Sequence, residues 1–338
     1  MCGADRGGCS LTAAIVVKDL RKRYKDREAV RGVSFEVAQG EIFGIVGPNG
    51  AGKTTTLEMM EGLRRRDGGS VQVLGMDPAR EPYRVRERIG VQFQMTAIQE
   101  KMRVDEALAL FASFYRRRGD VAKLIAMLGL QPYLGQSFKN LSGGWQQRVS
   151  LALAAVHDPE IIFLDEPSTG LDPAARRELW EMIRGLREQG KTIVLTTHYM
   201  EEAEQLCDRV AMFREGEVAL LDQPKRLVAR MAGWDYIDFV SDDASLADIE
   251  RLPCVQRAVE TDGCIRVHGD DVQQVALAVL VLADSRGWRI RNLRFAAGTL
   301  DDLFVLLAGG EASGEARREG SAAKGEGSVA MGEGSGVV

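Results

Sequence analysis

Residues 47–54 have the types and the spacing that phosphate chemistry requires. They read GPNGAGKT, so three glycines precede a lysine and a threonine. Glycines let backbone N–H groups curl around phosphate oxygens, and the start of a helix adds a favourable dipole. In this spacing we expect Lys53 to reach the β- and γ-phosphates and Thr54 to ligate Mg²⁺. An ordinary glycine-rich turn is the alternative, and the flanking strand and helix patterns oppose it.

A second chemical segment ends in two acids. The apolar run Ile161–Leu164 leads directly into Asp165 and Glu166. A carboxylate at the C-terminal end of a buried strand lies where ligands bind in open α/β sheets. We predict that Asp165 orients the metal and its waters and that Glu166 activates water as a general base. Two solvated acids at a strand end are the alternative, which the phosphate loop makes weaker.

A third segment, residues 141–148, reads LSGGWQQR. Ser142 is a natural N-cap, and the apolar positions that follow it recur at helical spacing on one face. Gly143 and Gly144 allow a phosphate to approach exposed N–H groups. The segment therefore predicts a second anion-binding helix start.

These motifs need a scaffold in which strands alternate with helices. We expect strands at 15–17, 33–37, 41–46, 70–74, 89–93, 161–164 and 192–196. We expect helices from Lys53 to about Gly62, from Val104 to about Leu130, and over Pro173–Gln189. Alternation of this kind implies a parallel sheet with both faces covered.

The sequence pattern of the chain changes after about Pro224. Strand patterns at 236–240, 264–267 and 289–293 and helix patterns at 272–285 and 300–308 predict a small α+β unit. From Gly309 onward the chain contains Gly, Glu, Ser, Ala and Arg without aromatics, so we expect disorder there.

Composition excludes several classes of protein. The 338 residues suffice for about two domains. The longest apolar run, Val275–Ala283, is too short for a bilayer, which needs roughly 20 residues. Met1–Thr12 shows no secretory signal pattern. A net charge of −5 argues against a general affinity for nucleic acid, and five cysteines without a CxxC pair read as reduced thiols.

From about Ile15 to Val228 these motifs resemble the ATP-binding-cassette (ABC) ATPase family. The resemblance implies an α/β P-loop NTPase cassette, in which a mixed sheet core and a helical subdomain bind ATP and Mg²⁺. It also implies a dimer in which the signature segment of one subunit, residues 141–148, covers the ATP held by the other. The domains we expect are an N-terminal tail at 1–12, the cassette at 13–228 with its helical subdomain at about 95–157, an α+β accessory domain at 229–308, and a tail at 309–338.

The resemblance assigns further residues. Tyr24 matches the aromatic that stacks on adenine, and His198 matches the histidine that touches the γ-phosphate. Gln94 matches the glutamine that contacts Mg²⁺ and senses the membrane partner, with Gln92 as a less favoured alternative. Ser168–Asp172 matches the loop that crosses the dimer interface. The complete predicted site comprises catalytic Lys53, Glu166 and His198, metal-binding Thr54, Gln94 and Asp165, and nucleotide-binding Tyr24, Gly47, Pro48, Asn49, Gly50, Ala51, Gly52, Lys53, Thr54, Thr55, Gln94, Ser142, Gly143 and Gly144.

Trp145 departs from the family pattern, which has a glutamine at this position. A glutamine three residues after Ser142 has the spacing of a capping box, in which its side chain accepts from the N-cap N–H. Indole only donates, so Trp145 cannot do this. Either closure on ATP is weakened, or Trp145 is a tolerated packing residue beside intact phosphate-binding groups. We favour the second reading.

A single cassette without a membrane span implies a separate polytopic permease and a location at the cytoplasmic face of the cell membrane. Residues 93–101 and Trp288–Gly309 are similar to ATPases of the daunorubicin-resistance group, which favours export of a drug, antibiotic or lipid-like substrate. The alternative is a soluble ABC ATPase acting on ribosomes or DNA, although neither a second cassette nor a long coiled coil is present. A purely regulatory binding protein is disfavoured because Glu166 is present.

Overall fold

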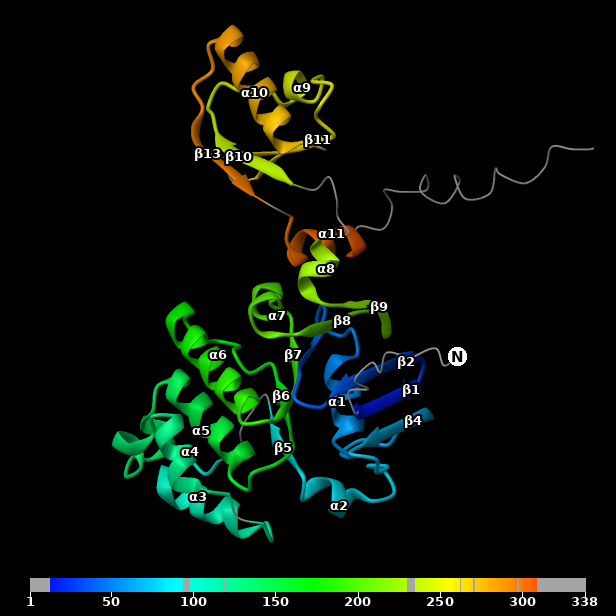
Figure 1. The fold of residues 1–338 in the computed structure, drawn as a ribbon, viewed down its shortest axis with the longest axis vertical. Coiled ribbons are helices and arrows are strands. Elements are labelled where there is room, and N and C mark those ends of the chain that lie inside the picture. The colour runs from blue at the N-terminus through cyan, green and yellow to red at the C-terminus, as the bar shows by residue number, and fades with distance from the viewer. Residues whose placement is uncertain are drawn as a thin grey trace, which may run out of the picture.

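The computed structural model describes residues 13–93, 98–117, 119–229, 235–261, 263–269, 271–296 and 298–308. Within these ranges two sheets and their helices form a large lower body, and a smaller sheet with its own helices lies above it (Figure 1). None of the helices in these ranges combines the length and the apolar character needed to span a bilayer.

A six-stranded mixed sheet forms the centre of the large body, in the order β5-β6-β7-β3-β8-β9. All neighbours pair in parallel except β9, which is antiparallel to β8. Its strands are β3 (Ile42–Val46), β5 (Ile89–Gln92), β6 (Ile161–Asp165), β7 (Thr192–Thr197), β8 (Arg209–Arg214) and β9 (Glu217–Asp222). Every residue of β3, β6 and β7 is buried, as expected for strands with both faces covered.

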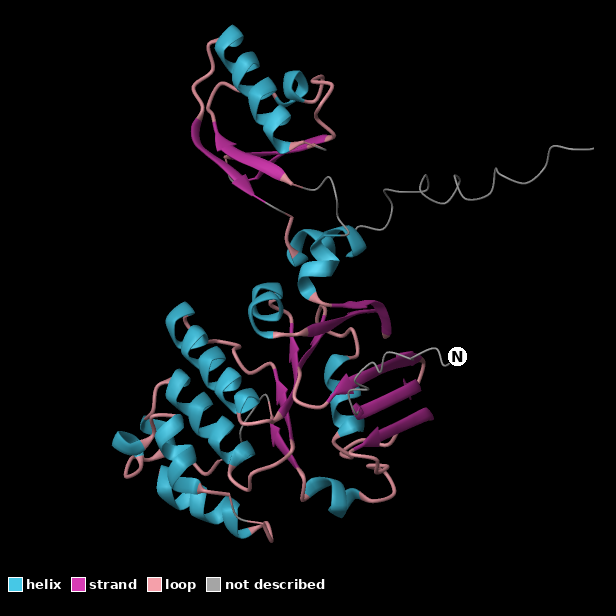
Figure 2. Ribbon diagram, viewed as in Figure 1, coloured by secondary structure: helices cyan, strands magenta, loops and turns pink. Residues whose placement is uncertain are grey.

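Helices cover both faces of this sheet (Figure 2). Side chains alternate between the faces, so Ile161 and Phe163 pack in one apolar cluster and Ile162 and Leu164 in the other. The helices of this body that come before the signature segment are α1 (Lys53–Met60), α2 (Pro82–Arg86), α3 (Val104–Ser113) and α4 (Val121–Met127). The short helices η1 (Gln131–Tyr133) and η2 (Phe138–Asn140) lead to α5 (Gly143–Ala155), α6 (Pro173–Glu188), α7 (Met200–Leu206) and α8 (Pro224–Ala229).

A three-stranded antiparallel sheet packs beside the central one, in the order β2-β1-β4. It comprises β1 (Ala13–Tyr24), β2 (Arg27–Ala38) and β4 (Gly68–Val73). The first two strands are much longer than the expected segments 15–17 and 33–37. They pair along almost their whole length, while charged residues such as Arg23 and Glu36 remain exposed. Backbone pairing thus extends the strands beyond their apolar residues.

The expected helix from Val104 to about Leu130 is two helices. α3 ends at Ser113 and α4 begins at Val121. Asp120 is the N-cap of α4 and accepts a hydrogen bond from the N–H of Lys123. This new cap, one residue after Gly119, explains why the apolar periodicity does not continue as one helix.

The smaller body is a four-stranded antiparallel sheet in the order β11-β12-β10-β13, with its own apolar cluster. Its elements are β10 (Tyr236–Val240), α9 (Leu246–Ile249), β11 (Arg257–Thr261), β12 (Cys264–His268), α10 (Val272–Arg286) and β13 (Arg291–Ala296). We call these residues, Tyr236–Ala296, the C-terminal unit. The last helix, α11 (Leu300–Ala308), contacts α7 and α8. The expected accessory domain at 229–308 therefore includes a helix that packs on the large body, and this division stays a prediction.

Candidate nucleotide site

The phosphate loop joins β3 to α1, and its glycines are required by close contacts. Gly47 has φ +155°, and a Cβ there would lie 2.4 Å from the carbonyl oxygen of Phe213. Gly52 has φ +99°, and its Cβ would lie 2.4 Å from the carbonyl oxygen of Ala29. Gly52 is also the N-cap of α1, and no side chain caps that helix start. The first N–H groups of α1 are thus available to an anion.

A cavity of about 670 Å³ opens beside this loop. It contains groups from the phosphate loop, from the β1–β2 turn and from the ends of β6 and β7. Its lining residues are Tyr24, Arg27, Ala29, Asn49, Gly50, Gly52, Lys53, Thr54, Thr55, Glu166, Thr169 and His198. The structure therefore brings nine of the predicted site residues to one cavity, while Gly47, Pro48, Ala51 and Asp165 are not among its lining residues.

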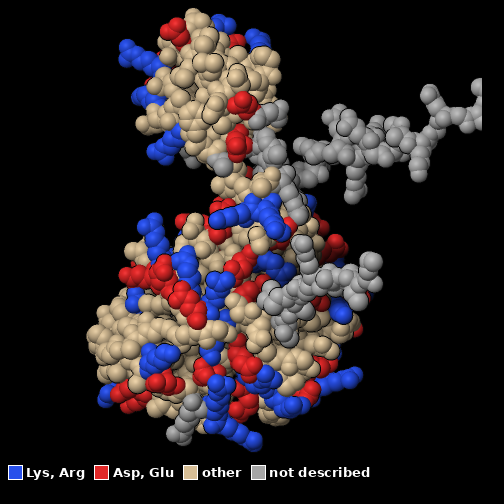
Figure 3. All heavy atoms as spheres, viewed as in Figure 1, with Lys and Arg blue, Asp and Glu red and all other residues tan. Residues whose placement is uncertain are grey.

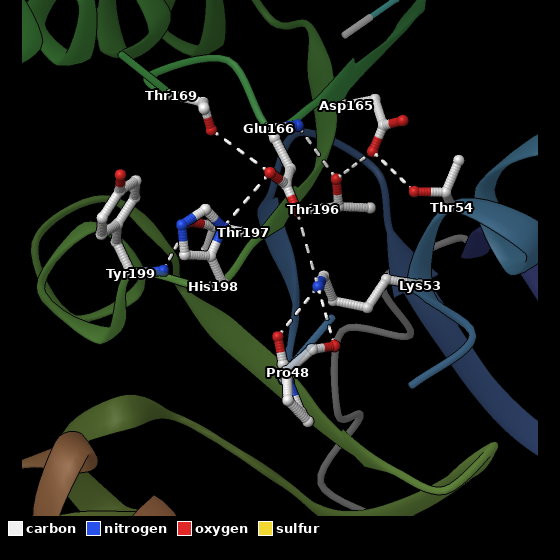
Figure 4. Close-up of polar contacts among 11 residues, drawn as sticks. Pro48, Lys53, Thr54, Asp165, Glu166, Thr169, Thr196, Thr197, His198 and Tyr199 are labelled. Carbon is white, nitrogen blue, oxygen red and sulfur yellow. Dashed lines mark hydrogen bonds and ion pairs between the residues drawn. The ribbon is translucent and has the colours of Figure 1, made fainter. Parts of the chain in front are cut away.

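Lys53 is a buried cation at the base of this cavity. Its ammonium donates hydrogen bonds to the carbonyl oxygens of Gly47 at 2.9 Å and Pro48 at 3.2 Å (Figure 4). It also lies 3.6 Å from Oε1 of Glu166. Burial lowers the pKa of Lys53, and the charge of Glu166 partly offsets this. The only carboxylate within ion-pair distance of Lys53 among the described residues is thus the predicted general base.

Glu166 is held in a strained conformation with its carboxylate in the cavity. Its φ is +47°, in the left-handed region that non-glycine residues rarely adopt. Its N–H faces both the carbonyl and the hydroxyl oxygen of Thr196, at 3.1 and 3.0 Å. Its Oε2 accepts from the hydroxyl of Thr169 at 3.2 Å and lies 3.2 Å from Nδ1 of His198 (Figure 4). The backbone turn therefore places the carboxylate among Lys53, Thr169 and His198.

Asp165 lies one residue earlier and points to the start of α1. Its Oδ1 accepts hydrogen bonds from the hydroxyls of Thr54 at 3.2 Å and Thr196 at 2.5 Å. Burial raises the pKa of Asp165, whereas these hydrogen bonds lower it. A hydroxyl and a carboxylate oxygen converge here, and oxygen ligands are the type that Mg²⁺ prefers.

Ser142, Gly143 and Gly144 do not line the nucleotide cavity. They border a separate cavity of about 340 Å³ together with Trp145, Arg148 and residues of the loop that precedes α6. That loop connects the two cavities in sequence, since Thr169 lines the first and Gly170 lines the second.

The chain is similar over most of its length to ATP-binding subunits of transporters. Residues 30–169 match the family described as ABC transporter. The chain is 37% identical over 304 residues to Nod factor export ATP-binding protein I of Paraburkholderia xenovorans, which covers 88% of this chain and 98% of that protein. It is 36% identical over 304 residues to daunorubicin resistance ATP-binding protein DrrA3 of Streptomyces coeruleorubidus, covering 88% and 96%. The chain belongs to the ABC transporter ATPase family.

Solved ABC cassettes share the fold. An ATP-binding subunit of an ABC transporter gives a TM-score of 0.59 at 28% identity, covering 65% of this chain and 93% of that one. A bacterial ABC transporter cassette solved as a dimer gives a TM-score of 0.55 at 27% identity, covering 62% and 98%. The predicted ABC cassette fold and the predicted ATPase activity are thereby confirmed.

Tyr24 lies at the rim of the cassette's nucleotide cavity. It is 37% exposed, and the cationic groups of Lys22 and Arg64 lie 5.6 and 5.3 Å from its ring centre. The stacking of this ring on adenine stays a prediction. Gln94 lies outside the described residues, and its role stays a prediction. Gln92 is 2% exposed and does not line the cavity.

Sequence reasoning missed Arg27. Its Nη2 donates to the carbonyl oxygen of Gly50 at 2.6 Å, and its side chain lines the nucleotide cavity. The described residues contain no carboxylate within ion-pair distance of it, so its positive charge faces the cavity uncompensated. A basic residue three positions after Tyr24, at the start of β2, was the signal that could have identified it.

Trp145 is packed in the cassette rather than directed at a helix cap. Ser142 occupies the N-cap position of α5, yet its side chain makes no cap hydrogen bond. The Trp145 ring lies 3.9 Å from that of Tyr133, and the Arg148 guanidinium lies 4.0 Å from the Trp145 ring. Arg148 also pairs with Glu178. These contacts favour the packing reading.

We expect Trp145→Gln to leave the ATPase rate within about twofold, because the anion-binding groups are unchanged. The same change should lower the free energy of unfolding by about 1 to 3 kcal/mol, since it removes the aromatic and cation–π contacts. Steady-state ATP hydrolysis and chemical denaturation check both parts. A several-fold gain in rate would instead mean that Trp145 impairs closure on ATP.

Glu61, at the C-cap of α1, is a buried acid close to this site. It is 3% exposed, and burial raises its pKa to about 8, with the charges of Asp165 and Glu58 adding to the effect. The folded chain therefore keeps a proton that the unfolded chain releases above the usual pKa of 4.5. This proton linkage stabilises the fold fully below pH 4.5, and the stabilisation is lost as the pH rises toward about 8.

We expect the free energy of unfolding of the wild-type chain to fall relative to Glu61→Gln as the pH rises from about 5.5 to about 7.5, by up to about 1.4 kcal/mol per unit. Chemical denaturation at both pH values measures the difference. Glu181→Gln, which changes an exposed glutamate of α6, is the control and should track the wild type. A difference between Glu61→Gln and wild type that does not vary with pH would contradict the prediction.

Proposed function

We propose that this ABC ATPase powers export of a drug, antibiotic or lipid-like substrate through a separate polytopic membrane permease. The observation that carries the proposal is similarity along nearly whole proteins. The relatives named for Nod factor export and for daunorubicin resistance are covered to 98% and 96% of their lengths. The similarity therefore includes most of the C-terminal residues beyond the cassette.

In the proposed reaction, Glu166 accepts a proton from the water that attacks the γ-phosphate. The bond between the γ-phosphorus and the bridging oxygen breaks as the new bond forms, and ADP leaves with that oxygen. His198 touches the γ-phosphate and keeps the Glu166 carboxylate oriented, 3.2 Å from its Nδ1. Lys53 places its positive charge beside the phosphate oxygens, between which negative charge shifts during the reaction. Phosphoryl transfer needs mainly positioning and charge stabilisation, and these residues supply both.

The site also fits Mg²⁺. Thr54 and Asp165 would hold the ion, because their oxygens already converge at 3.2 Å beside the start of α1. Mg²⁺ would neutralise the charge of the phosphates. Gln94 would be a further contact by its resemblance to the family pattern.

We further propose that two copies close around two ATP molecules. Two separate cavities are lined by the phosphate loop and by the signature residues Ser142, Gly143 and Gly144. The signature residues therefore do not contribute to the nucleotide cavity of their own chain. A dimeric ABC cassette is among the similar structures, which supports this arrangement.

Exposed apolar side chains support a membrane partner at the cytoplasmic face. Phe93 at the end of β5 is 51% exposed, and Leu110 and Phe114 in and after α3 are 40% and 64% exposed. Phe93 directly precedes Gln94, the glutamine that resembles the family's sensor of the membrane subunit. Docking of an apolar permease segment would cover these side chains.

An ABC ATPase that acts on ribosomes or DNA is the alternative. On the face seen in Figure 3, basic and acidic side chains of the cassette are interspersed, without a basic stripe that would follow a nucleic acid backbone. The relatives give no support for this alternative.

Purification of the tagged chain from membranes of its native host tests the proposal. We expect a polytopic membrane protein to copurify with the wild type and to be lost from Phe93→Ser/Phe114→Ser, while the ATPase activity of the purified double variant remains. Recovery of ribosomes instead would overturn the transport assignment.

A further inference from the structure

The helix α11 comes last among the described elements, yet it packs against the helix that follows His198. Leu300 at its start is fully buried in the cluster that contains Met200 and Ala203 of α7. Leu303 and Phe304 pack against the same cluster. α11 is therefore one of the elements that pack around α7.

A specific hydrogen bond fixes this contact. The N–H of Leu300 donates to Oε1 of Glu204 at 2.6 Å, so a carboxylate of α7 binds the N-terminus of α11. Helix N-termini favour negative charge, which makes this bond stronger than one between neutral groups. Thr299 and Asp302 form a reciprocal cap around the same turn. The start of α11 is thus ordered, and Glu204 is tied to it.

The other end of the connection is the C-terminal unit. Arg266 of β12 donates to Asp238 of β10 at 3.0 Å and to Asp302 of α11 at 3.0 Å. Its guanidinium also lies 3.9 Å from the Tyr236 ring. One arginine therefore joins the sheet of the C-terminal unit to the helix that holds α7.

α7 can transmit a displacement of its neighbours to the residues next to it in the chain. It has seven residues, too few to be stable alone, so its position depends on its tertiary contacts. On one side α6 holds it, because Trp180 donates to Glu202 at 3.0 Å and Arg184 donates to the carbonyl oxygen of Gln205 at 2.8 Å. On the other side α11 holds it through Glu204.

α7 begins only two residues after His198. Between them, the N–H of Tyr199 donates to the hydroxyl of Thr197 at 3.0 Å, and the Tyr199 ring lies 4.1 Å from that of His198. Because this turn is short and hydrogen-bonded, a displacement of α7 must change the position of the His198 imidazole. Phe304 of α11 also borders a cavity of about 220 Å³ together with Pro48 of the phosphate loop.

We propose that Glu204 is a positioning residue for His198, and that α11 and Arg266 make this position depend on the C-terminal unit. A partner or a second copy that moves the C-terminal unit would then change the rate of hydrolysis without touching the nucleotide. The inference rests on the proposed role of His198 at the γ-phosphate.

Histidine side-chain NMR of the nucleotide-free chain tests the coupling independently of activity. The chain has three histidines, and His198→Ala assigns the signal. We expect Glu204→Ala to shift or broaden the His198 resonance and Glu204→Gln, which keeps an acceptor for the Leu300 N–H, to restore most of it. Arg266→Ala should produce a smaller change of the same kind. Arg291→Ala, which breaks the exposed pair with Asp242 in the same unit, is the control and should leave the signal unchanged.

Kinetics give the functional consequence. We expect Glu204→Ala to lower kcat for ATP hydrolysis about three- to tenfold while KM for ATP stays within about twofold. An unchanged His198 resonance in Glu204→Ala would overturn the proposal, as would equal losses in kcat and in ATP affinity. If no membrane protein copurifies with the wild type, the proposed function fails, and the NMR result still decides the coupling.

Discussion

Glu166→Gln should lower the rate of ATP hydrolysis about 10²- to 10⁴-fold while ATP binding is retained. Glutamine keeps the size of the side chain and an oxygen that accepts from Thr169, but it cannot take a proton from water. Lys53 stays in place, because its two hydrogen bonds go to the carbonyl oxygens of Gly47 and Pro48. The nucleotide should therefore bind and then remain uncleaved.

An uncleaved nucleotide makes the proposed dimer observable. We expect size-exclusion chromatography of Glu166→Gln with ATP to give a dimer, and the same variant with ADP to give a monomer. Glu188→Gln, an exposed change at the end of α6, is the matched control and should hydrolyse ATP at the wild-type rate. A Glu166→Gln protein that binds ATP as a monomer would contradict the closed dimer, and full activity would remove Glu166 from the role of general base.

The sequence predicted the buried strands and the phosphate loop because local residues determine them. Ile161–Leu164 is a continuous apolar run, and Thr192–Thr196 has three apolar residues at its centre. These segments became β6 and β7 with extension by one residue each. Gly62 was expected at the end of α1, and it takes φ +72° just after that helix. The strands β8 and β9 were missed, although each contains four consecutive apolar residues, at 210–213 and 218–221. They form a hairpin joined at Glu215 and Gly216, and both of these residues take positive φ.

The site could be predicted only as far as single motifs reach. The motifs identified Lys53, Asp165 and Glu166, yet the left-handed backbone at Glu166 depends on Thr196 of the neighbouring strand. Arg27 enters the cavity only because β1 and β2 pair along their length and bring the turn over Gly50. The contact of α11 with α7 joins residues 96 positions apart through Glu204, and no local pattern contains that information.

Those long-range contacts alter how the predicted domains relate to function. If the unit at 229–308 were an independent appendage, truncating it would leave the cassette intact. Leu300 is instead fully buried among cassette residues, so removal of α11 would expose the apolar residues of α7 and its neighbours. Point substitutions at Glu204 and Arg266 therefore separate positioning from folding better than truncation does.

Lys53→Ala should abolish most ATP binding, with a loss of affinity of about 10- to 100-fold for ATP and a smaller loss for ADP. Lys53 is 5% exposed and donates to the loop carbonyls of Gly47 and Pro48, and phosphate oxygens are better acceptors because they are charged. The substitution also leaves Glu166 without the cation at 3.6 Å, so hydrolysis by any residual complex should be slower.

Equilibrium binding of ATP, ADP and adenosine measures the effect of Lys53→Ala. Lys18→Ala, an exposed change in β1, is the control. Adenosine binding should be the same in both variants if, as we propose, Lys53 contacts phosphate and Tyr24 contacts the base. An equal loss for all three ligands would mean that the loop has unfolded rather than lost a charge.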